Sequence, residues 1–180
     1  MAFLGSAPKN RRRRGNEILE FALVFAPFMA GVTSLIGIGW DIFANATLQR
    51  AVRVGVTYAV TVTSTQIASG CLTDNVKALV QANALGFLNG STGLSQIQVH
   101  YYQPPNPNSQ AALLDVSSQS TGNSPGNVIQ VSVPAYSLAK LIPRIVNGYS
   151  APDTSSQSIS VYSAGMLEPN ANPPCIGTAP

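Results

Sequence analysis

A run of twenty residues without a charged side chain, from Phe21 to Trp40, constrains this sequence more than any other feature. A helix of that length spans the roughly 30 Å hydrocarbon core of a bilayer. Trp40 stands where interfacial aromatic side chains are common, and Asp41 ends the run. The run therefore predicts one transmembrane helix.

The charges on either side of this run predict its orientation. Five basic residues precede it, Lys9 and Arg11 to Arg14, and no acid lies among the first fourteen residues. Two basic residues, Arg50 and Arg53, follow it within about 20 residues, and the side richer in Lys and Arg stays in the cytoplasm as a rule. We expect a cytoplasmic N-terminus and a periplasmic or extracellular C-terminal part.

Composition narrows the class of protein. Charged residues make up 9% of the 180-residue chain, against about 25% in soluble domains. After the first fourteen residues, five basic residues face seven acidic ones, a net charge of −2. This balance argues against a nucleic-acid-binding surface and against a charge-rich cytosolic enzyme. With His100 as its one histidine, the chain is predicted to have no catalytic residue, no metal and no cofactor.

Two other interpretations of the apolar run compete with a membrane anchor. Ala44-Asn45-Ala46 fits the cleavage site of a secretory signal, but the apolar region of such a signal is about 7–15 residues long, shorter than this one. The stretch ending at Cys71 resembles a lipid-attachment box. Because Cys71 lies about thirty residues beyond the run, it cannot belong to the same signal.

The junction before the apolar run carries a carboxylate, Glu20, which would cost about 2.5–3.5 kcal/mol at bilayer depth without a partner. Residues 11–21 read RRRRGNEILEF, and this order of basic residues, glycine, four residues, Glu and an aromatic resembles a type IV prepilin. In that family a prepilin peptidase cuts after the glycine, on the cytoplasmic side. The resemblance implies cleavage between Gly15 and Asn16, which leaves Glu20 beside Phe21 as the fifth residue of the mature chain.

Cleavage would also supply a partner for Glu20. The new ammonium group of Asn16, on the same chain or on a neighbouring subunit, could neutralise this carboxylate, and a pair between subunits would set their axial register. The alternative is that Glu20 reaches the interface of an uncleaved signal anchor.

Over residues 11–60 the sequence resembles the TadE-like family of Tad/Flp pilus minor pilins, or pseudopilins. Glu20 to Val24 (EFALV) and Pro27 match the opening of the family's apolar helix, and Leu48 to Ala59 (LQRAVRVGVTYA) matches the end of its stem. Pro27 comes one residue later than usual, Thr57 replaces a second stem arginine, and the acid-Phe-Gly-Arg element at the membrane exit is not recognisable.

This resemblance implies a minor pilin of a Tad/Flp type IV pilus, a single-pass protein of the bacterial inner membrane that acts in pilus assembly or initiation. Its implied partners are the prepilin peptidase, the other major and minor pilins, the inner-membrane assembly platform and the lipid bilayer, with no nucleic acid. The alternative is an uncleaved, signal-anchored periplasmic binding or scaffold module. An enzyme comes third and would need a pocket that gathers His100 with acidic residues.

The chain divides into a leader peptide (1–15), a transmembrane and stem helix (16–65) and an extracytoplasmic α+β domain with loops rich in Pro, Ser and Asn (66–180). Pro27 is a candidate kink in the helix.

Helical periodicity continues beyond Asp41 and predicts one buried side of the stem. That side comprises Ala44, Leu48, Ala51, Val52, Gly55 and Ala59.

Small residues recur every four positions within the apolar run, at Ala22, Ala26, Ala30 and Ser34. Such a stripe lets helices approach closely in lipid, where packing drives association. It is a candidate contact with other pilin helices, although small residues are common in membrane helices generally.

The C-terminal part is predicted to form a pilin-like α+β domain with one packing helix and an antiparallel sheet of about three strands. A helix is expected from Asn75 to about Leu88, capped by Thr73 or Asp74 and ended by Gly90. Alternating polar and apolar residues predict strands at 96–102, 129–133 and 159–162. A long loop is expected over 104–126, with a short element around 111–116.

The two cysteines, Cys71 and Cys175, both lie in the predicted exterior. A pair of cysteines in an oxidising compartment predicts a disulfide. It would close a loop of about 100 residues and contribute on the order of 4 kcal/mol in the chain-entropy description. His100 lies on the polar side of a predicted strand, as a surface residue would.

Overall fold

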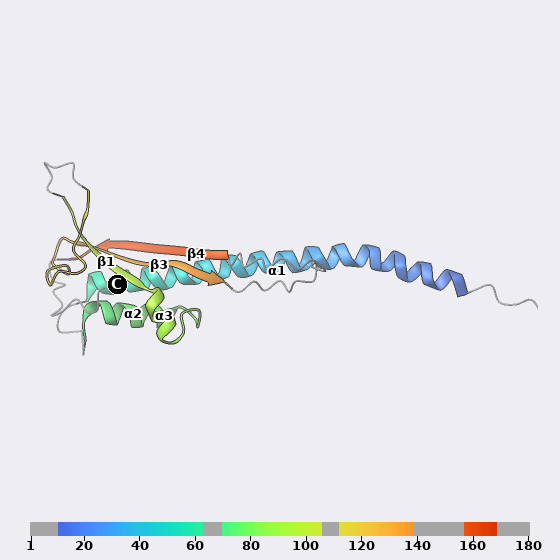
Figure 1. Ribbon diagram of the computed structural model, residues 1–180, viewed down its shortest axis with the longest axis horizontal. Coiled ribbons are helices and arrows are strands. Elements are labelled where there is room, and N and C mark those ends of the chain that lie inside the picture. The colour runs from blue at the N-terminus through green and yellow to red at the C-terminus, as the bar shows by residue number, and fades with distance from the viewer. Residues whose placement is uncertain (1–10, 63–69, 106–111, 139–156, 169–180) are drawn as a thin grey trace, which may run out of the picture.

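The computed structural model describes residues 11–62, 70–105, 112–138 and 157–168 (Figure 1). They form a long N-terminal helix followed by a small α+β domain with a four-stranded antiparallel sheet. The elements are α1 (Arg11–Thr61), α2 (Leu72–Asn83), α3 (Gly90–Gln96), β1 (Gln98–Gln103), β2 (Leu114–Asp115), β3 (Val128–Leu138) and β4 (Gln157–Met166).

Helix α1 has 51 residues and is about 77 Å long at 1.5 Å per residue. It continues through Pro27 and ends at Thr61. By length and composition it could cross a membrane, and only 6% of its most apolar window is buried, so that part is not a core helix. Figure 1 shows the N-terminal part of α1 projecting beyond every strand and both shorter helices.

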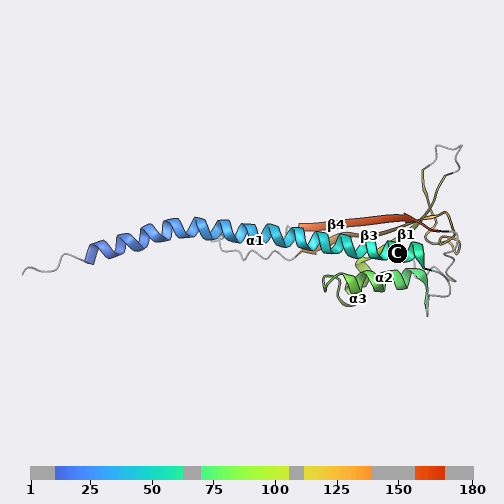
Figure 2. The ribbon, with the colours of Figure 1, turned by 180° about the vertical axis from the view of Figure 1, so that it is seen from behind.

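The C-terminal part of α1 is the central helix of the small domain. Helix α2 and strand β4 lie on different sides of it (Figures 1 and 2). Its buried positions recur at helical spacing, which confirms the predicted buried side of the stem. These positions include Ala44, Leu48, Ala51, Val52, Gly55 and Ala59.

A close approach between α1 and α2 depends on Gly55. A Cβ atom at this position would lie 2.5 Å from Val80 Cγ2 and 3.4 Å from Val76 Cγ1, both on α2. Glycine therefore lets the two helix backbones pack more tightly than any other residue would allow.

The sheet has the order β2-β1-β3-β4, and all its pairs are antiparallel. The three predicted strands are present as β1, β3 and β4, and β3 and β4 are longer than the segments that predicted them. A register shift between Val133 and Tyr136 lets β3 continue past Pro134, whose missing amide hydrogen cannot join the ladder.

Among the described residues the sheet has one strand more than the three predicted, and this strand lies where a short element was expected around 111–116. Strand β2 has two exposed residues, Leu114 and Asp115, which pair with Gln103 and Tyr102. A strand of two residues has no alternation to reveal it.

The predicted single packing helix was also wrong in extent and number. Helix α2 begins at Leu72 after Cys71 as N-cap and ends at Asn83, because Leu85 and Gly86 turn the chain with φ values of 48° and 88°. Gly90, expected to end the helix, is instead the first residue of α3.

Several predictions fall outside the described residues. They are the leader up to residue 10, the stem from 63 to 65 and the cysteine at 175. Within the leader, α1 already begins at Arg11.

A buried hydroxyl pair joins α2 to the sheet and predicts alkaline sensitivity. The Tyr101 hydroxyl lies 3.1 Å from Thr73 Oγ1, and Tyr101 is fully buried. Burial raises the pKa of Tyr101 from 10.0 to about 12. The folded state therefore keeps Tyr101 protonated to a higher pH than the unfolded state does. This contribution to stability is complete below about pH 10 and is lost as the pH rises towards 12, on the order of a few kcal/mol in all.

We expect the detergent-solubilised full chain to lose urea resistance over that interval, and we expect Tyr101→Phe to remove most of the loss. At neutral pH the same variant should cost about 1 kcal/mol, because it leaves the Thr73 hydroxyl without its partner. An equal alkaline loss in both proteins would contradict this role of Tyr101.

Candidate functional site

The residues predicted to be processed lie in the first turns of α1. The backbone at Gly15 and Asn16 is helical. Glu17 and Glu20 are exposed, and no ion pair joins either of them to another described side chain. Phe21 is 66% exposed and stacks on Phe25, with ring centroids 5.3 Å apart.

The small-residue stripe lies on the same uncovered part of α1. Ala22, Ala26, Ala30 and Ser34 are all exposed. The Ser34 hydroxyl donates a hydrogen bond of 2.8 Å to the Ala30 carbonyl, so its polarity is satisfied within the helix. The stripe therefore offers a surface without large side chains or unsatisfied hydroxyl groups to a neighbouring helix.

We call residues 17–43 of α1 the shaft. It is about 40 Å long, longer than the roughly 30 Å core of a bilayer. Large apolar side chains are exposed along it. Soluble monomers rarely expose so much continuous apolar surface to water. They are Ile18, Leu19, Phe21, Leu23, Val24, Phe25, Phe28, Met29, Leu35, Ile36, Ile38, Ile42 and Phe43.

Where the shaft meets the small domain, four aromatic rings gather. Phe87, in the turn between α2 and α3, lies 5.7 Å from Trp40 and 6.2 Å from Phe43 between ring centroids. Tyr136 of β3 meets Phe87 edge to face at 6.0 Å. Aromatic side chains are typical of the boundary between a membrane core and water, and this cluster stands at the end of the apolar shaft.

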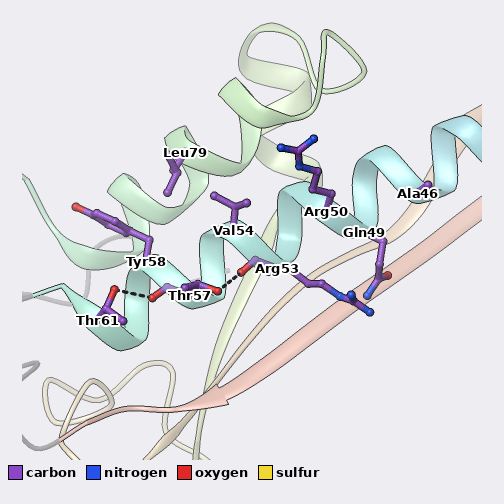
Figure 3. Close-up of a pocket in the computed structure, with 9 residues that line it drawn as sticks. All are labelled: Ala46, Gln49, Arg50, Arg53, Val54, Thr57, Tyr58, Thr61 and Leu79. Atoms are coloured by element: carbon purple, nitrogen blue, oxygen red, sulfur yellow. Dashed lines mark hydrogen bonds between the residues drawn. The ribbon is translucent and has the colours of Figure 1, made fainter.

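A groove of about 670 Å³ runs along α1 on the small domain (Figure 3). Its floor is a strip of α1 residues at helical spacing, and Leu79 of α2 contributes to one side. The α1 residues that line it are Ala46, Gln49, Arg50, Arg53, Val54, Thr57, Tyr58 and Thr61.

Two arginines are the charged groups of this groove. Arg50 and Arg53 are both exposed and extend from α1 in different directions (Figure 3). Within the described part of the chain, the one ion pair is that of His100 with Asp115, so neither guanidinium group has a carboxylate partner there. The groove can therefore accept an anionic group beside an apolar surface.

Three other polar side chains of the groove are hydrogen-bonded. Thr57 and Thr61 donate hydrogen bonds of 2.9 and 2.8 Å to the carbonyls of Arg53 and Thr57 on their own helix. Gln49 Nε2 donates to the Tyr162 carbonyl on β4 at 3.0 Å. Among the described residues that line the groove, the two arginines supply the charged groups for binding.

Sequence reasoning used Arg50 and Arg53 to orient the chain and assigned them no binding role. The signal was present in the polar face of the stem, where Gln49, Arg53 and Thr57 recur at helical spacing. What the sequence did not reveal is that α2 and the sheet leave this face open.

The other predicted site residues lie away from the groove. Cys71 is disulfide-bonded, but Cys175 lies outside the described residues, so their pairing stays a prediction. His100 Nδ1 is 3.3 Å from Asp115 Oδ2 at the partly exposed edge of the sheet. Hydrogen bonds from the Ser117 side chain and backbone, more than His100, lower the pKa of Asp115. The described residues contain no group of three metal-ligating side chains.

No family model, no curated protein and no solved structure matches this chain.

Proposed function

We propose that this chain is a minor pilin (pseudopilin) of a Tad/Flp type IV pilus system. It enters the bacterial inner membrane as a prepilin, is cut by the prepilin peptidase after Gly15, and acts in assembly or initiation of the pilus. The observation that carries this proposal is the division of α1 into an exposed apolar shaft and a half that is the core helix of a small α+β domain.

The apolar shaft could be covered first by lipid in the membrane and then by other pilins in the pilus. In the membrane, lipid covers the shaft, with the basic leader in the cytoplasm and the small domain outside. In a pilus, the shafts of neighbouring pilins would cover it. The stripe from Ala22 to Ser34 would then allow close helix contacts.

Glu20 is the residue on which assembly should depend most. It lies on the exposed shaft among apolar side chains, where an unpaired carboxylate is costly. Cleavage creates an ammonium group at Asn16 that can pair with it on the same or a neighbouring subunit. The assembly platform would act on the chain while it is still in the membrane.

We expect Glu20→Ala to abolish surface filaments in a strain whose chromosomal copy is deleted and replaced by the variant. Glu168→Ala, which removes an exposed carboxylate of the small domain, is the matched control and should leave filament number unchanged. Ala26→Leu with Ala30→Leu in the same strain should also reduce filaments by blocking close helix packing.

Electron microscopy of the cells counts the filaments, and immunoblotting confirms equal amounts of each variant. Normal filament numbers with Glu20→Ala, or in the deletion strain itself, would contradict a role in assembly.

A second candidate function is an uncleaved, signal-anchored periplasmic scaffold module, favoured by the arginine groove on the small domain. That protein would keep its leader and use the groove to hold a partner in an envelope complex. The first residue of the mature chain distinguishes the two functions.

A further inference from the structure

The acids of the shaft and the arginines of the groove have the same spacing. Glu17 and Glu20 are three residues apart, and so are Arg50 and Arg53. All four side chains are exposed, and none has an ion-pair partner among the described residues. One shift of 33 residues, about 50 Å along a helix, brings Glu17 beside Arg50 and Glu20 beside Arg53.

The same shift matches the apolar residues of the two surfaces. It sets Phe21 beside Val54 and Phe25 beside Tyr58, which line the groove. Phe21 and Phe25 stack on one face of the shaft and are 66% and 47% exposed, so no other described segment covers this face. The same 33-residue shift therefore forms two charge pairs and two apolar pairs.

We propose that the groove binds the N-terminal turns of the shaft of a second copy of this chain, parallel to α1 and displaced by 33 residues. The parallel arrangement follows because every copy inserts in the same orientation. This interface rests on the proposed function, since a displacement of about 50 Å lifts one shaft out of the membrane, as filament growth would. The interface joins two different surfaces of the same chain. Each bound copy therefore leaves a free groove or shaft for another copy, and the assembly can grow as an open filament rather than a closed ring.

The register also explains why cleavage would precede docking. With the same shift, Arg13 and Arg14 of an uncut chain would lie beside Ala46 and Thr47, one helical turn before Arg50. Like charges would then meet in the groove and oppose binding. Removal of residues 1–15 takes these arginines away and leaves Glu17 and Glu20 as the first charged side chains.

A photo-crosslinking amino acid at Thr57 tests this interface in cells that assemble the full chain. Thr57 is exposed in the groove, and its partner in the proposed register is Val24. We expect the probe to crosslink to residues 21–28 of a second copy. Because positions 24 and 57 of one helix are about 50 Å apart, such an adduct must join two copies. The same probe at exposed Leu113, on the sheet edge near β2, should give no adduct with the shaft.

Charge variants test the electrostatic part of the register. Arg50→Glu with Arg53→Glu should lower the adduct yield by about tenfold or more, because two attractive contacts become repulsive. Arg50→Gln with Arg53→Gln should lower it less. An unchanged yield, an equal loss in both variants, or adducts on another protein or another segment would overturn the proposal.

The outcomes separate this interface from the proposed function. Filaments that depend on Glu20 but give no adduct at residues 21–28 would refute the register and leave the minor-pilin function standing. A mature chain that begins at Met1 would refute the function itself.

Discussion

Replacing Gly55 with leucine should prevent the small domain from folding around α1. A Cβ atom at position 55 would already lie 2.5 Å from Val80 Cγ2, closer than carbon atoms tolerate. Val80 is fully buried and branched at Cβ, so it cannot rotate away freely. Inserting one extra carbon into such packing costs about 1–3 kcal/mol, and a whole leucine side chain costs more. Small domains have only about 5–15 kcal/mol of stability in total.

A graded series makes this prediction quantitative. Gly55→Ala should destabilise the domain by about 1–3 kcal/mol, and Val80→Ala in the same chain should recover part of that loss by removing the clash. Gly31→Ala in the shaft is the matched control, because its Cβ would meet nothing within 4 Å. It should be neutral or stabilising, since alanine favours a helix by about 1 kcal/mol over glycine.

Limited proteolysis and thermal unfolding of the detergent-solubilised chains measure the series. A protease-resistant domain in the Gly55→Leu variant would contradict the close contact between α1 and α2.

The second large effect is expected at the processing site. Gly15→Leu should leave the chain uncut in cells that contain the prepilin peptidase, because a bulky side chain replaces the glycine that precedes the cut. The wild-type chain should lose residues 1–15 and with them five positive charges, so its net charge falls from +3 to −2. The sequence pI of 9.1 then describes only the precursor.

Gel mobility reports this change. The wild-type chain should migrate faster from peptidase-positive than from peptidase-deficient cells, and Gly15→Leu should migrate like the precursor in both. Gly5→Leu, a matched glycine substitution within the leader, should be cut normally. Equal mobility of the wild-type chain in the two strains would exclude processing by this enzyme.

The long helix was the most predictable part of the fold. An uncharged run of twenty residues followed by helical periodicity predicted both halves of α1, including the buried positions from Ala44 to Ala59. The three longer strands were predictable for a similar reason, because each buries one face and alternates accordingly. These patterns lie within a short stretch of sequence, so they can be recognised without knowing which helix or strand packs against it.

What the sequence missed depends on contacts between distant segments. A short element was expected around 111–116, but its identity as strand β2 depends on pairing with β1, because its two exposed residues show no alternation. Helix α2 stops early because Leu85 adopts a left-handed conformation that its residue type does not suggest. The arginine groove was missed because its openness depends on where α2 and β4 pack against α1.

The proposed function requires that this chain is a prepilin cut between Gly15 and Asn16. N-terminal sequencing of the protein extracted from membranes identifies the cut site. We predict a mature chain that begins at Asn16 and retains the apolar shaft. A chain that begins at Met1, as in an uncleaved anchor, or at Thr47, as after a secretory signal, would contradict the account.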